Sequence, residues 1–169
     1  TVTLDLTITN SNTGTDTQTS CDTYTWIDGN TYTTSNNSAT WILTNTEGCD
    51  STVTLDLTIN NTPSFTVSGT DPSICNASDG SITISGLNAN TSYTLGYDSL
   101  NIASQISLMT TDVTGKFVIN GLSAGLYTNF SISLNGCEYT SVDVIDLNNP
   151  GAPIIDNQSS LTECDTYTL

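Results

Sequence analysis

The string TVTLDLTI occupies residues 1–8 and recurs unchanged at residues 52–59. In the second copy an apolar residue stands at every second position from Val53 to Ile59, and Thr or Asp stands between them. Side chains of a strand point alternately to its two faces. The period of two therefore predicts a β-strand that has one buried face and one face exposed to water.

A second string, CDTYT, begins at Cys21 and recurs at residues 164–168. Recurring strings of this kind are the sequence signature of tandem modules. We therefore predict an all-β chain built from small β-sandwich modules. Four segments are expected: the last strand of a preceding module at residues 1–10, a short module at residues 11–60, a longer module at residues 63–156, and the first strand of a following module at residues 157–169.

The short module is predicted to contain four strands, at residues 22–26, 31–34, 39–44 and 51–59. Asp28-Gly29-Asn30 has the composition of a hairpin turn between the first two. Because a module of about fifty residues needs large side chains for its core, we expect its aromatic residues to be buried. These residues are Tyr24, Trp26, Tyr32 and Trp41. A platform on which a sugar stacks is the alternative role for them.

The longer module is predicted to contain seven short strands, at residues 64–68, 81–85, 92–97, 104–109, 116–120, 127–134 and 138–146. Short strands separated by Gly, Asn and Asp turns are typical of an immunoglobulin-like sandwich. The string GLSAGLY at residues 121–127 has the composition of a tight turn before a late strand. Tyr127 is expected to pack at this corner.

Charge excludes several classes of function. The chain has 17 acidic residues against one basic residue, Lys116, has no His, and carries a net charge of −16. Nucleic acids and anionic membranes would repel it, and no stretch is apolar enough for membrane insertion within this segment. Catalytic arrangements that need His cannot form. Asp143 and Asp146, considered as a glycosidase pair, would lie on opposite faces of a strand. The chain is therefore not expected to be an enzyme.

The five cysteines are widely spaced and form no zinc-binding motif. In a Thr-rich β protein such spacing predicts disulfides and an oxidising, extracellular location. Each complete module holds two cysteines, so we predict a Cys21–Cys49 bridge in the short module and a Cys75–Cys137 bridge in the longer one. Cys164 is expected to pair with a cysteine outside this chain.

Several strings resemble known repeats. CDTYTW at residues 21–26 and GCDSTVTL at residues 48–55 resemble the short repeats of giant surface adhesins of Bacteroidota. CNASDGSITI at residues 75–84, GLY at residues 125–127 and NGC at residues 135–137 are similar to the SprB-type gliding-adhesin repeat. The resemblance implies type IX secretion, display at the cell surface, and a role in adhesion, gliding motility or filament formation.

Calcium is the candidate cofactor. Asp71, Asp79 and Asp98 lie in predicted loops of the longer module and carry the oxygen ligands that Ca²⁺ prefers, although none belongs to an EF-hand. The alternative is that they are ordinary turn residues.

The resemblance also implies O-linked glycosylation. Ser51 and Ser99 stand in the patterns Asp-Ser-Thr and Asp-Ser-Leu, which match the short acceptor pattern of such proteins. A common tripeptide in a chain rich in Ser and Thr is the alternative.

The predicted function is structural. Tandem sandwiches give length to a stalk or filament, and disulfides give it rigidity, with neighbouring modules or subunits of the same protein as partners. The near absence of Lys removes one usual protection against edge-to-edge strand pairing. The terminal strands could then complete a neighbouring subunit's sheet; the simpler alternative is that they belong to modules cut by the ends of the sequence. A ligand-binding module for glycans or a host surface is the competing function.

Overall fold

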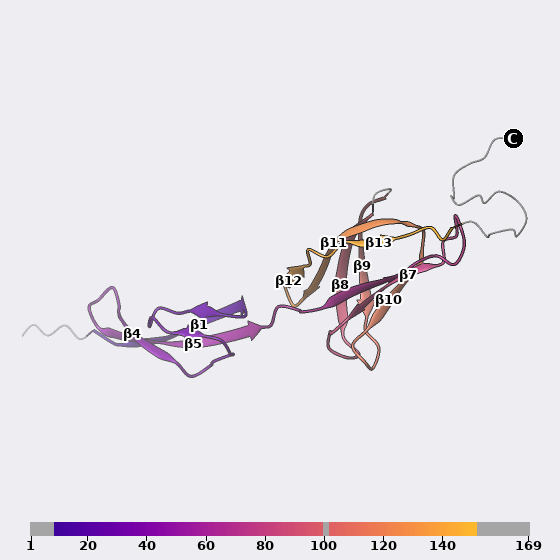
Figure 1. Ribbon diagram of the computed structural model, residues 1–169. Coiled ribbons are helices and arrows are strands. Elements are labelled where there is room, and N and C mark those ends of the chain that lie inside the picture. Colours follow the sequence, from indigo (N-terminus) through magenta and orange to yellow (C-terminus); the bar gives the residue numbers. More distant parts are fainter. Residues whose placement is uncertain (1–8, 100–101, 152–169) are drawn as a thin grey trace, which may run out of the picture. The chain divides into compact units, whose positions relative to one another are not determined.

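The computed structural model describes residues 9–99 and 102–151 of the 169-residue chain. These residues form strands, turns and connecting segments without a helix, so the all-β prediction is confirmed. The described part of the chain thus contains no helix long and apolar enough to cross a membrane. The chain divides into two compact units, Thr1–Asn61 and Thr62–Leu169 (Figure 1). The strands predicted within residues 1–8 and 157–169 lie outside the described residues.

The first unit contains a three-stranded sheet in the order β1-β5-β4 (Figure 1). Its strands, together with those of a separate two-stranded hairpin, are β1 (Asn12–Cys21), β2 (Tyr24–Thr25), β3 (Thr31–Tyr32), β4 (Thr40–Thr44) and β5 (Asp50–Asn60). β4 runs antiparallel to β5, whereas β1 runs parallel to it. The parallel pair extends from Asn12 opposite Ser51 to Cys21 opposite Asn60.

β1 is a strand that the sequence analysis did not predict. Its ten residues include no aliphatic or aromatic side chain, so they show no alternation of apolar and polar positions. Asp16, Gln18 and Ser20 are half-buried, whereas the Thr residues between them are exposed. The Asp16 carboxylate accepts hydrogen bonds from the Gln18 side chain and from the indole N–H of Trp26 (2.8 Å). Hydrogen bonds therefore let a polar strand occupy this side of β5.

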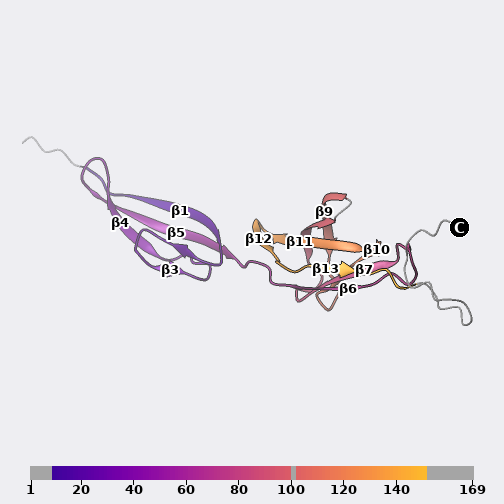
Figure 2. The same ribbon diagram turned by 45° about the horizontal axis from the view of Figure 1, so that its top comes forward.

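The hairpin predicted at Asp28-Gly29-Asn30 is confirmed. Gly29 has a φ of +80°, a left-handed conformation that favours glycine. The Trp26 N–H donates to the Asn30 carbonyl (3.1 Å), and the Tyr32 hydroxyl donates to the Asp28 carboxylate (2.7 Å). The turn thus joins β2 to β3, which lies beside the sheet in Figure 2.

The core of the first unit is small. Its buried members are Trp26, Leu55 and Leu57, with Tyr24, Tyr32, Ala39, Val53 and Ile59 packed against them. Burial is confirmed for Trp26, and Tyr24 and Tyr32 are partly buried. The prediction is wrong for Trp41, whose side chain is 41% exposed. Trp41 belongs to β4 and lies opposite Val53 of β5. Because β4 forms an edge of the sheet, few other side chains cover Trp41 there.

The second unit consists of two sheets (Figures 1 and 2). One has the order β10-β7-β6; the other has the order β12-β11-β8-β9, and β13 also pairs with β11. The strands are β6 (Thr66–Thr70), β7 (Gly80–Ser85), β8 (Ser92–Ser99), β9 (Ile102–Thr110), β10 (Phe117–Leu122), β11 (Gly125–Leu134), β12 (Cys137–Thr140) and β13 (Ile145–Leu147). Each pairing is antiparallel.

β12 and β13 replace the single strand predicted at residues 138–146. Between them Ser141 is buried, and its backbone N–H donates to the Phe130 carbonyl (2.7 Å). Its hydroxyl donates to the Asp143 carboxylate (2.6 Å). Such local side-chain bonds compete with the ladder of a sheet and interrupt the strand. Val142 and Val144 consequently project into solvent, with exposures of 93% and 57%.

Side chains from both sheets form one core in the second unit. Its buried members are Phe65, Ile82, Ile84, Leu87, Tyr93, Leu95, Phe117, Leu122, Tyr127, Phe130, Ile132 and Leu147. Tyr127 packs at the turn before β11 as predicted, and its hydroxyl donates to the Ser123 carbonyl (2.9 Å). Burial raises the pKa of Tyr127, and the nearby Tyr97 adds to the shift.

Candidate functional site

The chain enters and leaves the first unit at opposite ends of its sheet. β1 begins opposite Ser51, and β5 ends at Asn60, opposite Cys21. Because a strand rises about 3.3 Å per residue, about 30 Å separate entry and exit along these strands. β1 and β5 pair with one another. The hydrogen bonds between them are therefore roughly perpendicular to the direction from the entry of the chain to its exit.

The second unit is also entered and left at different ends of a strand. The Asn148 N–H, directly after β13, donates to the carboxylate of Asp71, directly after β6 (2.8 Å). β13 lies close against β6, since a Cβ at Gly69 would meet the side chains of Ile145 and Leu147. The chain therefore enters at the beginning of β6 and leaves beside the end of β6.

The predicted Cys21–Cys49 bridge is wrong. Cys21 is in a disulfide, whereas Cys49 is a half-buried free thiol beside the Thr9 hydroxyl. Cys21 lies opposite Asn60 at one end of β5, and Cys49 precedes the other end. About 36 Å of extended strand separate these positions, whereas the Cα atoms of a disulfide lie within about 7 Å. The unpredicted parallel pairing of β1 is thus the reason for the error.

The predicted Cys75–Cys137 bridge is also wrong. Cys137 is disulfide-bonded and lies opposite Leu134, at one end of β11. The Cys75 sulfur lies 2.8 Å from the Pro150 carbonyl oxygen, three residues after Leu147, which lies opposite Gly125 at the other end of β11. About 30 Å of extended strand separate the two ends. Cys75 is itself disulfide-bonded. Cys164, which is predicted to pair with a cysteine outside this chain, lies outside the described residues.

The three Asp residues proposed as calcium ligands do not form one site. Asp71 and Asp79 lie between β6 and β7, whereas Asp98 lies in β8. Asp79 accepts hydrogen bonds from the side chain and backbone of Ser73, which lower the pKa of Asp79. Asp98 accepts one from the Asn129 side chain (2.7 Å). Within residues 9–99 and 102–151, no group of three or more Asp, Glu, Cys or His could hold a metal ion.

Both serines proposed as glycosylation acceptors lie in strands. Ser51 is half-buried in the central strand β5, between Asn12 and Leu43. Ser99 is half-buried at the end of β8, opposite Tyr127. Their glycosylation stays a prediction, which the intact mass of the native protein tests.

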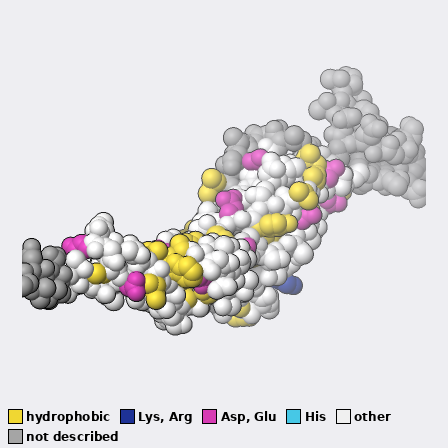
Figure 3. Space-filling view, turned by 90° about the vertical axis from the view of Figure 1, so that its left-hand side faces the viewer, with side chains coloured by type: hydrophobic (Ala, Val, Ile, Leu, Met, Phe, Trp, Pro, Cys, Tyr) yellow, Lys and Arg dark blue, Asp and Glu magenta, His cyan; other side chains and the backbone are white. Residues whose placement is uncertain are grey.

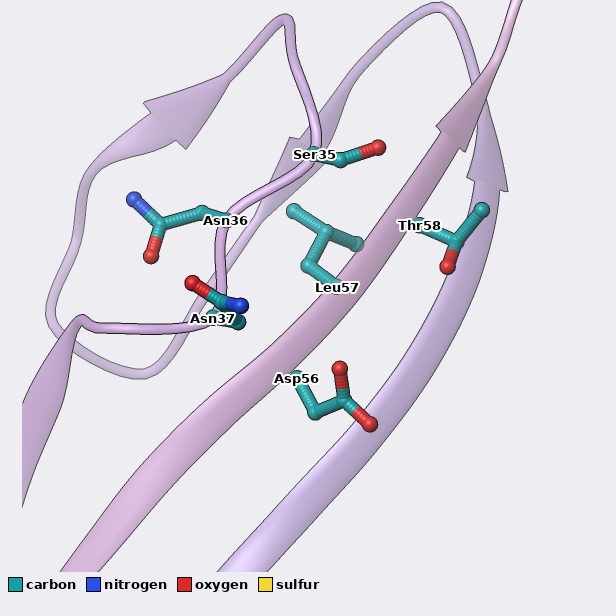
Figure 4. A pocket seen from close by; sticks show the side chains of 6 residues that line it. All are labelled: Ser35, Asn36, Asn37, Asp56, Leu57 and Thr58. Atoms are coloured by element: carbon teal, nitrogen blue, oxygen red, sulfur yellow. The ribbon is translucent and has the colours of Figure 1, made fainter.

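Figure 4 shows a shallow depression beside β5 in the first unit. Its lining residues are Ser35, Asn36, Asn37, Asp56, Leu57 and Thr58. The backbones of Asn36 and Leu57 pair through two hydrogen bonds (3.0 and 2.8 Å), and the Ser35 hydroxyl accepts one from the Ile59 N–H (3.0 Å). Leu57 points toward this segment, whereas Asp56, the only carboxylate of the lining, points away. The depression therefore places no base beside the Ser35 hydroxyl and does not form a catalytic pair.

Carboxylates are scattered over the surface in the view of Figure 3, among polar and hydrophobic side chains. Hydrogen bonds from the Gln18 side chain and the Trp26 indole lower the pKa of Asp16. Hydrogen bonds from the Thr114 hydroxyl and from the backbone N–H groups of nearby residues lower the pKa of Asp112. A general acid needs a raised pKa, so these two carboxylates act as ionised acceptors that hold local structure.

A strand was predicted at residues 39–44, but the exposure of the observed strand β4 was not predicted. Its five residues, Thr40–Thr44, are all exposed, although three of them are large and apolar. The available signal was the run Trp41-Ile42-Leu43, because a strand with one buried face alternates and this one does not. An exposed apolar edge strand is a template for pairing with another strand.

No protein-family model matches the chain, and no curated protein matches it. The likeness to adhesin repeats therefore rests on the quoted strings alone.

Proposed function

We propose that the chain is a structural repeat segment of an extracellular stalk or filament, which gives length and rigidity for surface adhesion or gliding. The path of the chain carries the proposal, because each unit is entered at one end of a strand and left at the other. Units connected in this way add their lengths when they are repeated.

The pairing of β1 with β5 also suits a module under load. A pull on the two ends of the first unit acts along both strands, and the ten residue pairs from Asn12 to Cys21 must slide together. A pull on two adjacent ends would instead open such pairs one after another. Resistance to force depends on the rate of unfolding, which is low when many contacts must break in one step.

The cysteines and the repeated strings agree with an extracellular location. Cys21, Cys75 and Cys137 are disulfide-bonded, and stable disulfides are typical of oxidising compartments. The strings that resemble adhesin repeats add the expectation of surface display.

We also propose that the second unit is an immunoglobulin-like sandwich. The orders β10-β7-β6 and β12-β11-β8-β9, the antiparallel pairings and the shared core support this assignment. The hydrogen bond from the Tyr127 hydroxyl to the Ser123 carbonyl corresponds to the tyrosine corner of such sandwiches.

Single-molecule force spectroscopy of the full chain tests the load-bearing role. Handles are attached at both termini, and a reductant is present so that disulfides do not limit the extension. We expect the first unit to give one cooperative rupture that releases the 49 residues from Asn12 to Asn60, or at most about 170 Å of chain.

The matched control pulls the same protein through handles at Asn12 and Asp50. These positions lie at the same end of the β1–β5 pair, so the pairs should separate in sequence at a lower force. Equal forces in the two geometries, or extension without a rupture, would contradict the proposal.

A further inference from the structure

β4 is an open edge of the first sheet. Among the described residues its only strand partner is β5. Trp41, Ile42 and Leu43 are 41%, 63% and 45% exposed. Edge strands are usually protected by a charge, a proline or a bulge. Thr40–Thr44 contains neither a charged residue nor a proline, and its register with β5 is continuous.

The hydrogen bonds of the hairpin show which residues of β4 offer backbone groups to a new strand. The Leu55 N–H donates to the Ala39 carbonyl, and the Asn45 N–H donates to the Cys49 carbonyl (both 2.8 Å). These pairs continue the β4–β5 register on either side. Because hydrogen-bonded pairs alternate along an antiparallel ladder, residues 41 and 43 direct their backbone groups to β5. The residues that direct theirs to the open edge are therefore Thr40, Ile42 and Thr44.

The sequence of β4 is self-complementary about Ile42. In an antiparallel pair of two β4 strands centred there, Thr40 lies opposite Thr44, Trp41 lies opposite Leu43, and Ile42 lies opposite its own copy. Every apolar side chain then meets an apolar one, and such cross-strand pairs stabilise a sheet.

The same alignment satisfies the backbone. Each strand contributes the N–H and C=O groups of its three outward residues, all of which fall in hydrogen-bonded pairs. A shift by one residue would set outward groups against residues whose own groups already bond to β5.

We propose that β4 is an interface for a second copy of this chain, which pairs with it antiparallel about a two-fold axis at Ile42. The arrangement joins two three-stranded sheets into one six-stranded sheet. It is isologous, since the same patch is used by both copies. The inference does not depend on the load-bearing role, because it concerns lateral contacts between copies.

Charge sets the conditions for this contact. Each copy carries a net charge of −16, so two copies repel one another at low ionic strength, and salt reduces that repulsion. A single strand pair is a small interface, which gives weak association between free molecules. Copies held side by side on a surface would have a high effective concentration and would pair more completely.

Cross-linking tests the register directly. In a Cys49→Ser background, Ile42→Cys places two thiols on the proposed axis, where opposed Cα atoms would lie about 5.5 Å apart. Thr44→Cys is the matched control, because its own copy would lie four residues away along the strand. We expect a disulfide-linked dimer from Ile42→Cys and not from Thr44→Cys under mild oxidation. Equal cross-linking of both variants would overturn the register.

Sedimentation of the full chain from micromolar to millimolar concentration, in low and high salt, tests the surface. Ile42→Lys places like charges opposite one another and should weaken self-association by about tenfold or more. Val142→Lys, at a side chain that is 93% exposed outside the strands, should leave it unchanged. Emission from the buried Trp26 shows that each variant is folded.

Two other results would overturn the proposal. Loss of association in Ile106→Lys, with Ile42→Lys unaffected, would assign the contact to the edge strand β9, where Ile106 is 72% exposed. The second result combines two observations: association is lost when residues 1–8 are removed, and Ile42→Cys forms no cross-link. β4 would then pair with the TVTLDLTI segment of another copy and not with that copy's β4.

Discussion

Replacing Leu55 with Ala removes a side chain that is 0% exposed from a core that has three buried members among the described residues. The other two are Trp26 and Leu57. Leu-to-Ala changes at fully buried sites cost about 2–5 kcal/mol, through lost transfer free energy and the cavity that remains. A unit of this size holds a total stability of only about 3–5 kcal/mol. Leu55→Ala is therefore expected to leave the first unit largely or wholly unfolded at room temperature.

The two tryptophans make the assay selective. Trp26 and Trp41 are the only tryptophans of the chain, and both belong to the first unit. Urea titration followed by tryptophan emission thus reports on that unit without a signal from the second one. The wild-type chain should show a transition from the emission of a buried Trp26 to that of an exposed indole, and Leu55→Ala should show the exposed emission at low urea.

Leu43→Ala is the matched control, because it makes the same chemical change in the same sheet at a side chain that is 45% exposed. Its unfolding midpoint should stay close to that of the wild type. If Leu43→Ala were as destabilising as Leu55→Ala, or if Leu55→Ala kept the wild-type midpoint, the described core of the first unit would be wrong.

Four further outcomes are expected. Gly115→Ala should lower the melting temperature of the second unit more than Gly136→Ala, because both glycines have positive φ but only the Gly115 Cβ would lie 2.0 Å from the Leu87 carbonyl oxygen; calorimetry that gives equal shifts would contradict this contact. The pKa of Asp16 is lowered below 3.8, so its ionised form contributes stability above that pH, which is lost as the pH falls through the lower, folded-state pKa; urea midpoints at pH 6 and pH 3 should differ less in Asp16→Asn than in the wild type, and an unchanged difference would count against it. Tyr127→Phe should destabilise the second unit by about 1 kcal/mol through loss of the hydrogen bond to Ser123, and an unaltered melting temperature would show that this bond does not stabilise the unit. Iodoacetamide should label Cys49 in the folded, non-reduced protein and leave Cys21 unlabelled, and the reverse pattern in a peptide map would contradict the disulfide assignment.

The strands that could be predicted from the sequence are those whose buried face is apolar. Val53, Leu55 and Leu57 alternate with polar residues, and the observed β5 contains all three. β1 could not be predicted in this way, because Asp16 and Gln18 take inward positions and are held by hydrogen bonds. Thr at every second position of residues 13–19 was the remaining signal, and it reports only the exposed face.

The error in the Cys21–Cys49 bridge follows from the unpredicted strand β1. Without it, the spacing of Cys21 and Cys49 in the sequence gave no measure of their separation along the sheet. The parallel register places Cys21 at the Asn60 end, far from Cys49. The exposure of Trp41 likewise depends on which strand lies at the edge, and composition does not contain that information.

The parallel pairing of β1 with β5 is the claim on which the path of the chain depends, and spin-label distances test it most directly. In a Cys49→Ser background, nitroxides replace the exposed residues Thr13 and Thr58 in one sample, and Thr19 and Thr58 in another. Thr19 lies opposite Thr58, so their backbones should be about 5 Å apart, whereas those of Thr13 and Thr58 should be about 20 Å apart. A short distance for Thr13 and Thr58 with a long one for Thr19 and Thr58 would mean that entry and exit share one end.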